Sequence, residues 1–263
     1  MSVQLPTRSR VTLGVVAVTG VTAFAWPLLF APASGMDPAQ APSLFALVLP
    51  LVLAVVIIDL SGDVLDVKAL ALLGVLCALG SVLRPLSAGT AGMDLIFFVL
   101  ILGGRVFGPG FGFAQGALTL FSSALLTGGV GPWLPYQMLA AGFVGLGAGG
   151  LPRTSPRVEM ALLCVYGFGS AFAYGWLMDF AFWPYGLGPA TQFSFDPNAS
   201  AWQNLQTFAL FNLATSMGWN LGRAITNVVL ILLVGPSMLR ILGRTARRAI
   251  LQPVPRSAEI AEY

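Results

Sequence analysis

Long apolar runs, separated by short polar or Gly- and Pro-rich connections, make up most of this chain. Because a bilayer core about 30 Å thick is crossed by about 20 residues of helix, each run is a candidate transmembrane helix. The runs cover residues 11–31, 42–60, 68–84, 93–107, 110–127, 133–151, 158–183 and 205–236. The pattern predicts an all-α integral membrane protein of about eight transmembrane helices. The first run is longer than the core of a signal peptide, so a retained helix is favoured although "APASG" resembles a cleavage site.

Small residues recur at intervals of about one helical turn in two of these runs. Ala141, Gly145 and Gly149 form one face of the sixth run. Such faces let membrane helices approach closely where no hydrophobic effect drives them together, so we expect this face to pack against a neighbouring helix. A similar docking stripe in the third run comprises Gly74, Ala78 and Ser81.

The sixth run begins with a Pro-rich stretch, "TGGVGPWLPY". The residue before a proline disfavours α-helical geometry, so we expect a bent loop at the outer surface, with Trp133 and Tyr136 at the interface. Irregular backbone at membrane depth is tolerated where it lines a cavity or is buried in protein. This indicates a site that opens outward. An aromatic belt beside an ordinary loop is the alternative interpretation.

Polar residues in the last run predict a single helical stripe with aliphatic residues on the opposite face. The stripe comprises Asn212, Thr215, Ser216, Trp219, Asn220, Arg223 and Asn227. A charged residue within a span is expected to face the bundle interior or water. The stripe therefore either lines a ligand site or ties helices together. We assign its outer part, from Asn212 to Asn220, to the site, and Arg223 and Asn227 to structure.

Further candidates come from the outer ends of other runs. Asp179 lies among aromatic residues in "YGWLMDFAFWPYG", and Asp94 opens the fourth run, where a carboxylate is often a helix cap. An aromatic cluster with one carboxylate and nearby amides suits an uncharged or zwitterionic ring system. The outer loop between the last two runs has enough aromatic residues to form a lid. The predicted substrate-binding residues are Trp133, Tyr136, Gln137, Trp176, Asp179, Asn212, Ser216, Trp219 and Asn220.

Composition excludes several classes of protein. The chain is 57% hydrophobic and 9% charged, with a single lysine, Lys68, and no histidine. A P-loop needs a Gly-Lys-Ser/Thr sequence that Lys68 does not provide, and a Ser-His-Asp triad or a His-ligated metal needs histidine. The two cysteines lie in separate apolar runs and are predicted to be packing residues. We therefore expect no enzyme, metal or cofactor, and nothing predicts a nucleic-acid partner.

The distribution of basic residues predicts the orientation of the protein in the membrane. With both termini in the cytoplasm, 11 of the 13 basic residues lie in cytoplasmic segments, as the positive-inside rule requires. The basic sequence "RILGRTARRAI" is expected to contact anionic headgroups, or else to help dock a cytoplasmic partner. We divide the chain into an N-terminal extension with two transmembrane helices (1–67), a six-helix membrane domain (68–236) and a basic cytoplasmic tail (237–263).

From Lys68 onward the sequence resembles the substrate-binding (S) components of energy-coupling factor (ECF) vitamin transporters. The resemblance rests on the small-faced helix at 68–84, on "GGRVFGPGFGFAQGALTL", on "GGVGPWLPYQMLAAGFVGLGAGGLP" and on "NLGRAITNVVLILLVGP" with its basic tail. Within that family the chain is most similar to the cobalamin-type subgroup. The first two runs are an addition to the six-helix pattern.

The resemblance implies a subunit of the cell membrane that binds a vitamin in an outward-facing pocket, and the similarity to the cobalamin-type subgroup implies a corrinoid. It also implies association with a transmembrane scaffold subunit and two cytoplasmic ATPases, with Gly74 and Ala78 on the docking surface. An ion-coupled secondary transporter is one alternative, although such proteins use midplane carboxylates and internal repeats. The other alternative is a structural membrane protein whose polar stripe only packs helices.

Overall fold

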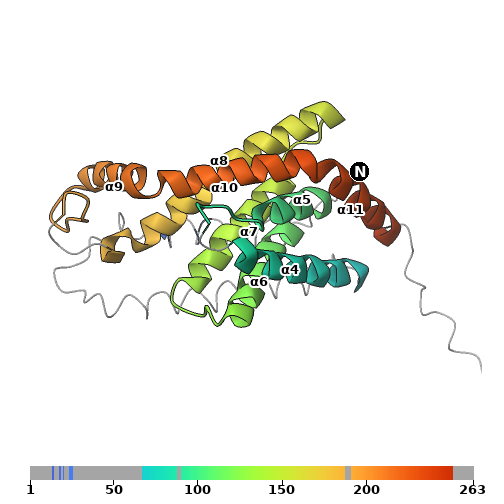
Figure 1. The fold of residues 1–263 in the computed structure, drawn as a ribbon, viewed down its shortest axis with the longest axis horizontal. Coiled ribbons are helices and arrows are strands. Elements are labelled where there is room, and N and C mark those ends of the chain that lie inside the picture. The colour runs from blue at the N-terminus through green and yellow to red at the C-terminus, as the bar shows by residue number, and fades with distance from the viewer. Residues whose placement is uncertain are drawn as a thin grey trace, which may run out of the picture.

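The computed structural model describes residues 67–87, 90–186 and 191–250, together with the separate positions 14, 18, 20, 24 and 25. Every regular element within these residues is a helix. The helices, labelled as in Figure 1, are α4 (Val67–Ser87), α5 (Phe97–Phe107), α6 (Pro109–Thr127), α7 (Leu134–Gly150), α8 (Pro156–Gly186), α9 (Ala201–Thr215), α10 (Met217–Leu233) and α11 (Gly235–Ile250). The six runs predicted between residues 68 and 236 are therefore helical. The second predicted run, 42–60, and most of the first lie outside the described residues.

Length separates the helices into spans and shorter pieces. Two described helices are long and apolar enough to cross a bilayer alone, α4 over Lys68–Ser87 and α8 over Pro156–Pro184. The pair α9 and α10 qualifies together but is bent by 66°. α5 has 11 residues, and at 1.5 Å per residue it covers about half of a bilayer core. These features fit a multi-pass membrane protein, while the total of eight spans stays a prediction.

Glycines bring the backbones of α6 and α7 into direct contact. A Cβ atom at Gly145 would meet the backbone of Gly112, and one at Gly116 would meet the backbone of Ala141. At the far end of the interface, Gly149 lies against the backbone of Pro109. The predicted packing face of the sixth run is thus confirmed. α6 and α7 are therefore held together by close contact between their backbones rather than by interlocking side chains at these positions.

The last predicted run is broken in the middle, contrary to the expectation of one continuous helix. α9 ends at Thr215 and α10 begins at Met217, so Asn212 and Asn220 lie on different helices. The Thr215 hydroxyl donates to the Phe211 carbonyl at 2.8 Å, a back-bonding geometry that bends helices. The prediction of a single stripe is therefore wrong.

The Pro-rich start of the sixth run also differs from expectation. Leu134, Pro135 and Tyr136 form the first turn of α7 rather than a bent loop. Proline is tolerated there because the N–H groups of a first turn have no partner within the helix. Only the residues up to Trp133 are irregular, and Tyr136 consequently lies inside the bundle, 3% exposed.

An ion pair joins α5 to the first turn of α8. The Arg105 guanidinium donates to Glu159, with Nη2–Oε2 at 2.6 Å, and to the Leu151 and Pro152 carbonyls. The two side chains are 5% and 19% exposed. Because each charge would be unpaired without the other, this pair holds the end of the bundle where α5 and α7 end and α8 begins. The opposite end carries the polar residues described next.

Candidate ligand-binding site

A stripe of small residues on α8 receives the polar side chains of α10, and the two helices cross in Figure 1. The Asn227 amide donates to the Gly167 carbonyl at 2.9 Å, and Arg223 Nη1 donates to the Ala171 carbonyl at 3.3 Å. A Cβ atom at Gly175 would collide with the Asn220 side chain. The stripe, one residue per turn, is therefore Gly167, Ala171 and Gly175. This stripe was not predicted, although its spacing of four residues is visible in the sequence.

Arg223 lies at the centre of a polar cluster near the Asp94 end of the bundle. Its guanidinium carbon is 5.1 Å from the Tyr174 ring centre and 5.5 Å from that of Phe97. Both distances suit a cation–π interaction. Its Nη1 atom also donates to Asn220 Oδ1 at 3.1 Å. Aromatic rings therefore replace some of the water that a guanidinium would otherwise need.

The connection between α4 and α5 contacts α10 beside Arg223. Gly92, at φ 78°, lies against the backbone of Trp219, and Gly222 lies against the Ala91 carbonyl. A side chain at either glycine would separate the two segments. This contact brings Asp94 into the electrostatic range of Arg223. The Asp94 carboxylate also accepts the Ile96 backbone N–H at 3.4 Å, but the N-cap of α5 is Ile96 and α5 has no side-chain capping bond, so Asp94 is not the cap that the sequence predicted.

A second polar pair forms between α8 and α9. The Asn212 amide donates to Asp179 Oδ2 at 2.6 Å, and the Ser216 side chain lies beside the same carboxylate. Arg223 acts electrostatically on Asp179 as well as on Asp94. The bend at Ser216 thus turns Asn212 and Asn220 toward one cluster although they belong to different helices.

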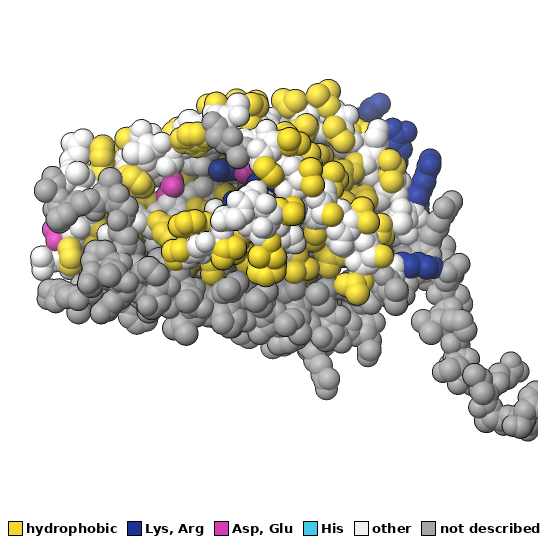
Figure 2. Space-filling view, turned by 60° about the horizontal axis from the view of Figure 1, so that its bottom comes forward, with side chains coloured by type: hydrophobic (Ala, Val, Ile, Leu, Met, Phe, Trp, Pro, Cys, Tyr) yellow, Lys and Arg dark blue, Asp and Glu magenta, His cyan; other side chains and the backbone are white. Residues whose placement is uncertain are grey.

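Arg84 on α4 and Gln137 on α7 add a third pair, with Nη2 and Oε1 3.0 Å apart. Arg84 also acts electrostatically on Asp94. Figure 2 shows acidic and basic side chains gathered in a depression of an otherwise apolar face. Arg84, Asp94, Asp179 and Arg223 make no ion pair within 4 Å with any described residue. Charges of both signs are therefore arranged around one region without neutralising one another by direct contact.

Three buried atoms in this cluster have no hydrogen-bond partner among the described residues. They are Asn212 Oδ1, Asn220 Nδ2 and Arg223 Nε. A buried polar group without a partner is costly, so an acceptor for two of these atoms and a donor for the third would stabilise the cluster. The described residues contain no group of three or more potential metal ligands among His, Cys, Asp and Glu.

The predicted aromatic members of the site are distributed differently from the polar ones. Trp133, Trp176 and Trp219 are 45%, 48% and 49% exposed. Tyr136 packs edge-on against Phe182 and Phe24, with ring centres 5.7 Å and 5.1 Å apart. The polar residues Asp179, Asn212, Ser216 and Asn220 are brought together, whereas Gln137 pairs with Arg84. Arg84 was absent from the predicted site, because its pairing depends on how α4 and α7 are placed.

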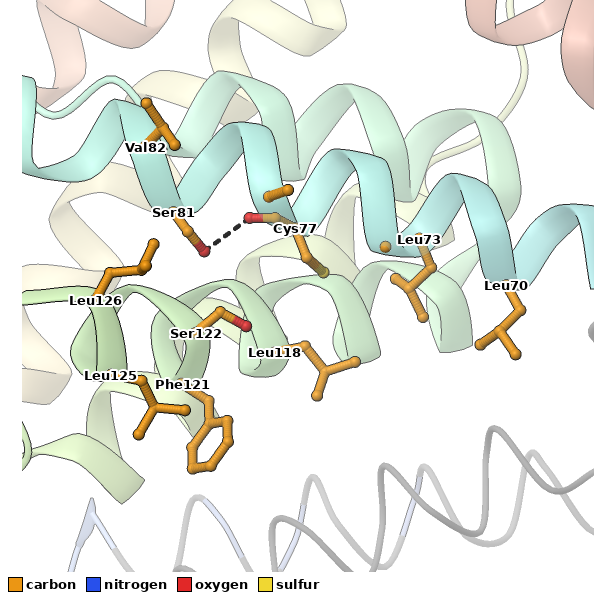
Figure 3. Close-up of a pocket in the computed structure, with 12 residues that line it drawn as sticks. Leu70, Leu73, Cys77, Ser81, Val82, Leu118, Phe121, Ser122, Leu125 and Leu126 are labelled. Carbon is orange, nitrogen blue, oxygen red and sulfur yellow. Dashed lines mark hydrogen bonds between the residues drawn. The ribbon is translucent and has the colours of Figure 1, made fainter.

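The predicted docking stripe on α4 borders a groove of about 750 Å³ between α4 and α6 (Figure 3). Gly74 and Ala78 are exposed there, and a Cβ atom at Gly74 would meet nothing within 4 Å. Ser81 is buried and donates to the carbonyls of Cys77 and Thr119 at 2.8 Å and 3.2 Å. Ser81 thus ties α4 to α6, while Gly74 and Ala78 remain open.

A comparison with known protein families identifies the family to which this chain belongs. A family model described as "ECF transporter, substrate-specific component" matches residues 68–235, well over half of the 263 residues. The protein therefore belongs to the ECF transporter substrate-specific components, which are membrane transporter subunits rather than enzymes. The match covers α4 to α10 and begins where the predicted extension ends. Searches of curated proteins and of solved structures give no match.

Proposed function

We propose that this subunit captures a vitamin in an outward-facing pocket at the Asp94 end of the bundle and delivers it inward. The orphaned atoms Asn212 Oδ1, Asn220 Nδ2 and Arg223 Nε carry the proposal, because a polar ligand would satisfy them. A corrinoid of the cobalamin type is the substrate class that the sequence resemblance favours.

The proposed binding residues are the polar members of the predicted set, with Arg223 and Arg84 added. Asp179, Asn212, Ser216 and Asn220 come from three helices and face one cluster. Gln137 is held by Arg84. The half-exposed tryptophans 133, 176 and 219 and the buried Tyr136 stay predictions of aromatic contacts.

The proposed partners are a transmembrane scaffold subunit and two cytoplasmic ATPases, which supply the energy that this chain has no P-loop to provide. The open side of α4 at Gly74 and Ala78 is the proposed docking surface, because small residues allow a partner helix to approach closely. We place both termini in the cytoplasm, and the protein in the cell membrane.

The experiment is mass spectrometry of small molecules released from the purified protein. We expect a vitamin with the wild type and at least a tenfold lower amount with Asn220→Ala or Asp179→Ala. The matched control is Asn227→Ala, because Asn227 is also a buried amide of α10 but lies two turns deeper and donates to Gly167.

Equal recovery from all four proteins would show that the polar cluster is not the binding site. Uptake that persists without ATPase subunits and stops when the ion gradient is collapsed would instead favour a secondary transporter. Absence of any bound small molecule after purification from vitamin-fed cells would favour a structural protein.

A further inference from the structure

α11 has two different sides, and only one of them is used within the bundle. The helix follows α10 after Val234 and contacts α5, α10 and α4, so it lies across the end of the bundle. Figure 1 shows it turned away from the line of α10. Met238, Leu239 and Leu242 pack against the core cluster, with Leu242 6% exposed. The apolar side of α11 is therefore already occupied.

The other side of α11 is basic and exposed. Arg240, Arg244 and Arg247 are exposed, and residues 235–250 contain no acidic residue. Arg240 donates to Pro236 O and Ser237 Oγ of its own first turn. Arg244 and Arg247 make no hydrogen bond or ion pair with any described residue. Three exposed guanidinium groups thus have no carboxylate partner among the residues that the structure describes.

Apolar side chains are also exposed on α11 and just before it. Ile241 lies between Arg240 and Arg244 in the sequence and is 63% exposed. Leu233, which precedes α11, is 73% exposed. Figure 2 shows basic side chains gathered at one end of the molecule, next to an apolar flank. An acidic protein surface would match the arginines but leave these apolar groups uncovered. A bilayer interface offers phosphate groups and hydrocarbon side by side, which matches both.

We propose that α11 is an interfacial helix whose arginines bind the phosphate groups of anionic phospholipids. A guanidinium forms paired hydrogen bonds with a phosphate and remains charged at all relevant pH values. Ile241 and Leu233 then lie in the hydrocarbon beside the headgroups. The same end of the bundle is held by the Arg105–Glu159 pair, so the lipid contact would act on a rigid structure.

The test is native mass spectrometry of the full-length protein, released from micelles containing equal amounts of phosphatidylglycerol and phosphatidylcholine. Wild type is expected to retain phosphatidylglycerol preferentially. The triple variant Arg240→Gln, Arg244→Gln, Arg247→Gln should lower that preference by on the order of tenfold or more, since each arginine bound to a phospholipid phosphate contributes about fivefold. The triple substitution to lysine should keep most of the preference, because it keeps the charge.

The matched control is Arg153→Gln with Arg157→Gln, two exposed arginines at the same end but outside α11. This pair should leave the preference within about twofold of wild type. An equal loss in the control, or no loss in the α11 glutamine variant, would overturn the proposal. Displacement of phosphatidylglycerol by millimolar inorganic phosphate would also overturn the proposal. So would an α11 glutamine variant that retains phosphatidylglycerol like wild type but no longer co-purifies with ATPase subunits. Unchanged thermal unfolding of each variant establishes that the fold is intact.

Discussion

Two helix interfaces of this protein are built on small residues but use them in opposite ways. Between α6 and α7, Gly112 and Gly145 bring backbone against backbone, and no side chain of either residue intervenes. Between α8 and α10, Gly175 leaves room for the Asn220 side chain, and the Gly167 carbonyl accepts a hydrogen bond from Asn227. The first interface is a contact without polar side chains, whereas the second presents amides and a guanidinium.

The difference shows how a membrane protein separates rigidity from binding. In lipid, small residues allow close packing because the hydrophobic effect does not drive helices together. A glycine opposite another glycine uses that space for the backbone itself. A glycine opposite asparagine uses it for a polar group whose bonds can be completed by a ligand. The α6–α7 interface is thus a scaffold, and the α8–α10 interface is the wall of the proposed site.

The most damaging change should be Gly145→Ala in the scaffold interface. Its Cβ atom would collide with the backbone of Gly112, which cannot rotate away as a side chain can. We expect a loss of about 3 kcal/mol in the free energy of unfolding, at the upper end for overpacking. Denaturation by SDS in detergent micelles measures it. Gly169→Ala, where a Cβ atom meets nothing within 4 Å, should be nearly neutral, and equal losses at both positions would refute the backbone-contact account.

Gly175→Ala should have a smaller effect on stability and a larger one on binding. Its Cβ atom would meet the Asn220 side chain, which can change rotamer. We expect a loss of about 1 kcal/mol in the free energy of unfolding, with at least a tenfold drop in bound vitamin because Asn220 is displaced. Both are measured on one preparation, by SDS denaturation and by mass spectrometry. If Gly175→Ala is as unstable as Gly145→Ala, or if it keeps its bound vitamin, the proposed distinction between the two interfaces is wrong.

The smallest effect is expected from Asn227→Ala, at the deep end of the α8–α10 interface. It removes the hydrogen bond to the Gly167 carbonyl, and such bonds between membrane helices contribute about 0.6 kcal/mol on average. SDS denaturation should detect that loss, and bound vitamin should remain within twofold of wild type. A tenfold loss of vitamin here would extend the site deeper along α10 than we propose.

Much of the fold could be predicted from the chain because apolar runs and glycine spacing act locally. The positions of six helices and the packing face through Ala141, Gly145 and Gly149 follow from such patterns. The break at Ser216 could not be predicted from periodicity, since polar spacing continues across it. The helical start of α7 was missed because a proline in the first turn interrupts no hydrogen bond of the helix.

The candidate site was predicted only in part, for a related reason. Asn212 and Asn220 were assigned to it from one stripe, yet they lie on two helices joined by a bend and bond different partners, Asp179 and Arg223. Arg84 entered the site only through its contact with Gln137, 53 residues away. Arg223 was assigned to structure, whereas its ring contacts and its unpartnered Nε atom place it within the cluster. Contacts between distant residues leave no periodic signal in the chain.

The sequence by itself determined that this is a membrane protein, where its apolar helical runs lie, and which face of α7 packs closely, because each of these depends on the composition of a short segment. The tertiary structure alone decided that Arg84, Asp94, Asp179 and Arg223 surround one region without forming direct ion pairs. The physical reason is that a charge acts over several ångströms through space, regardless of separation along the chain.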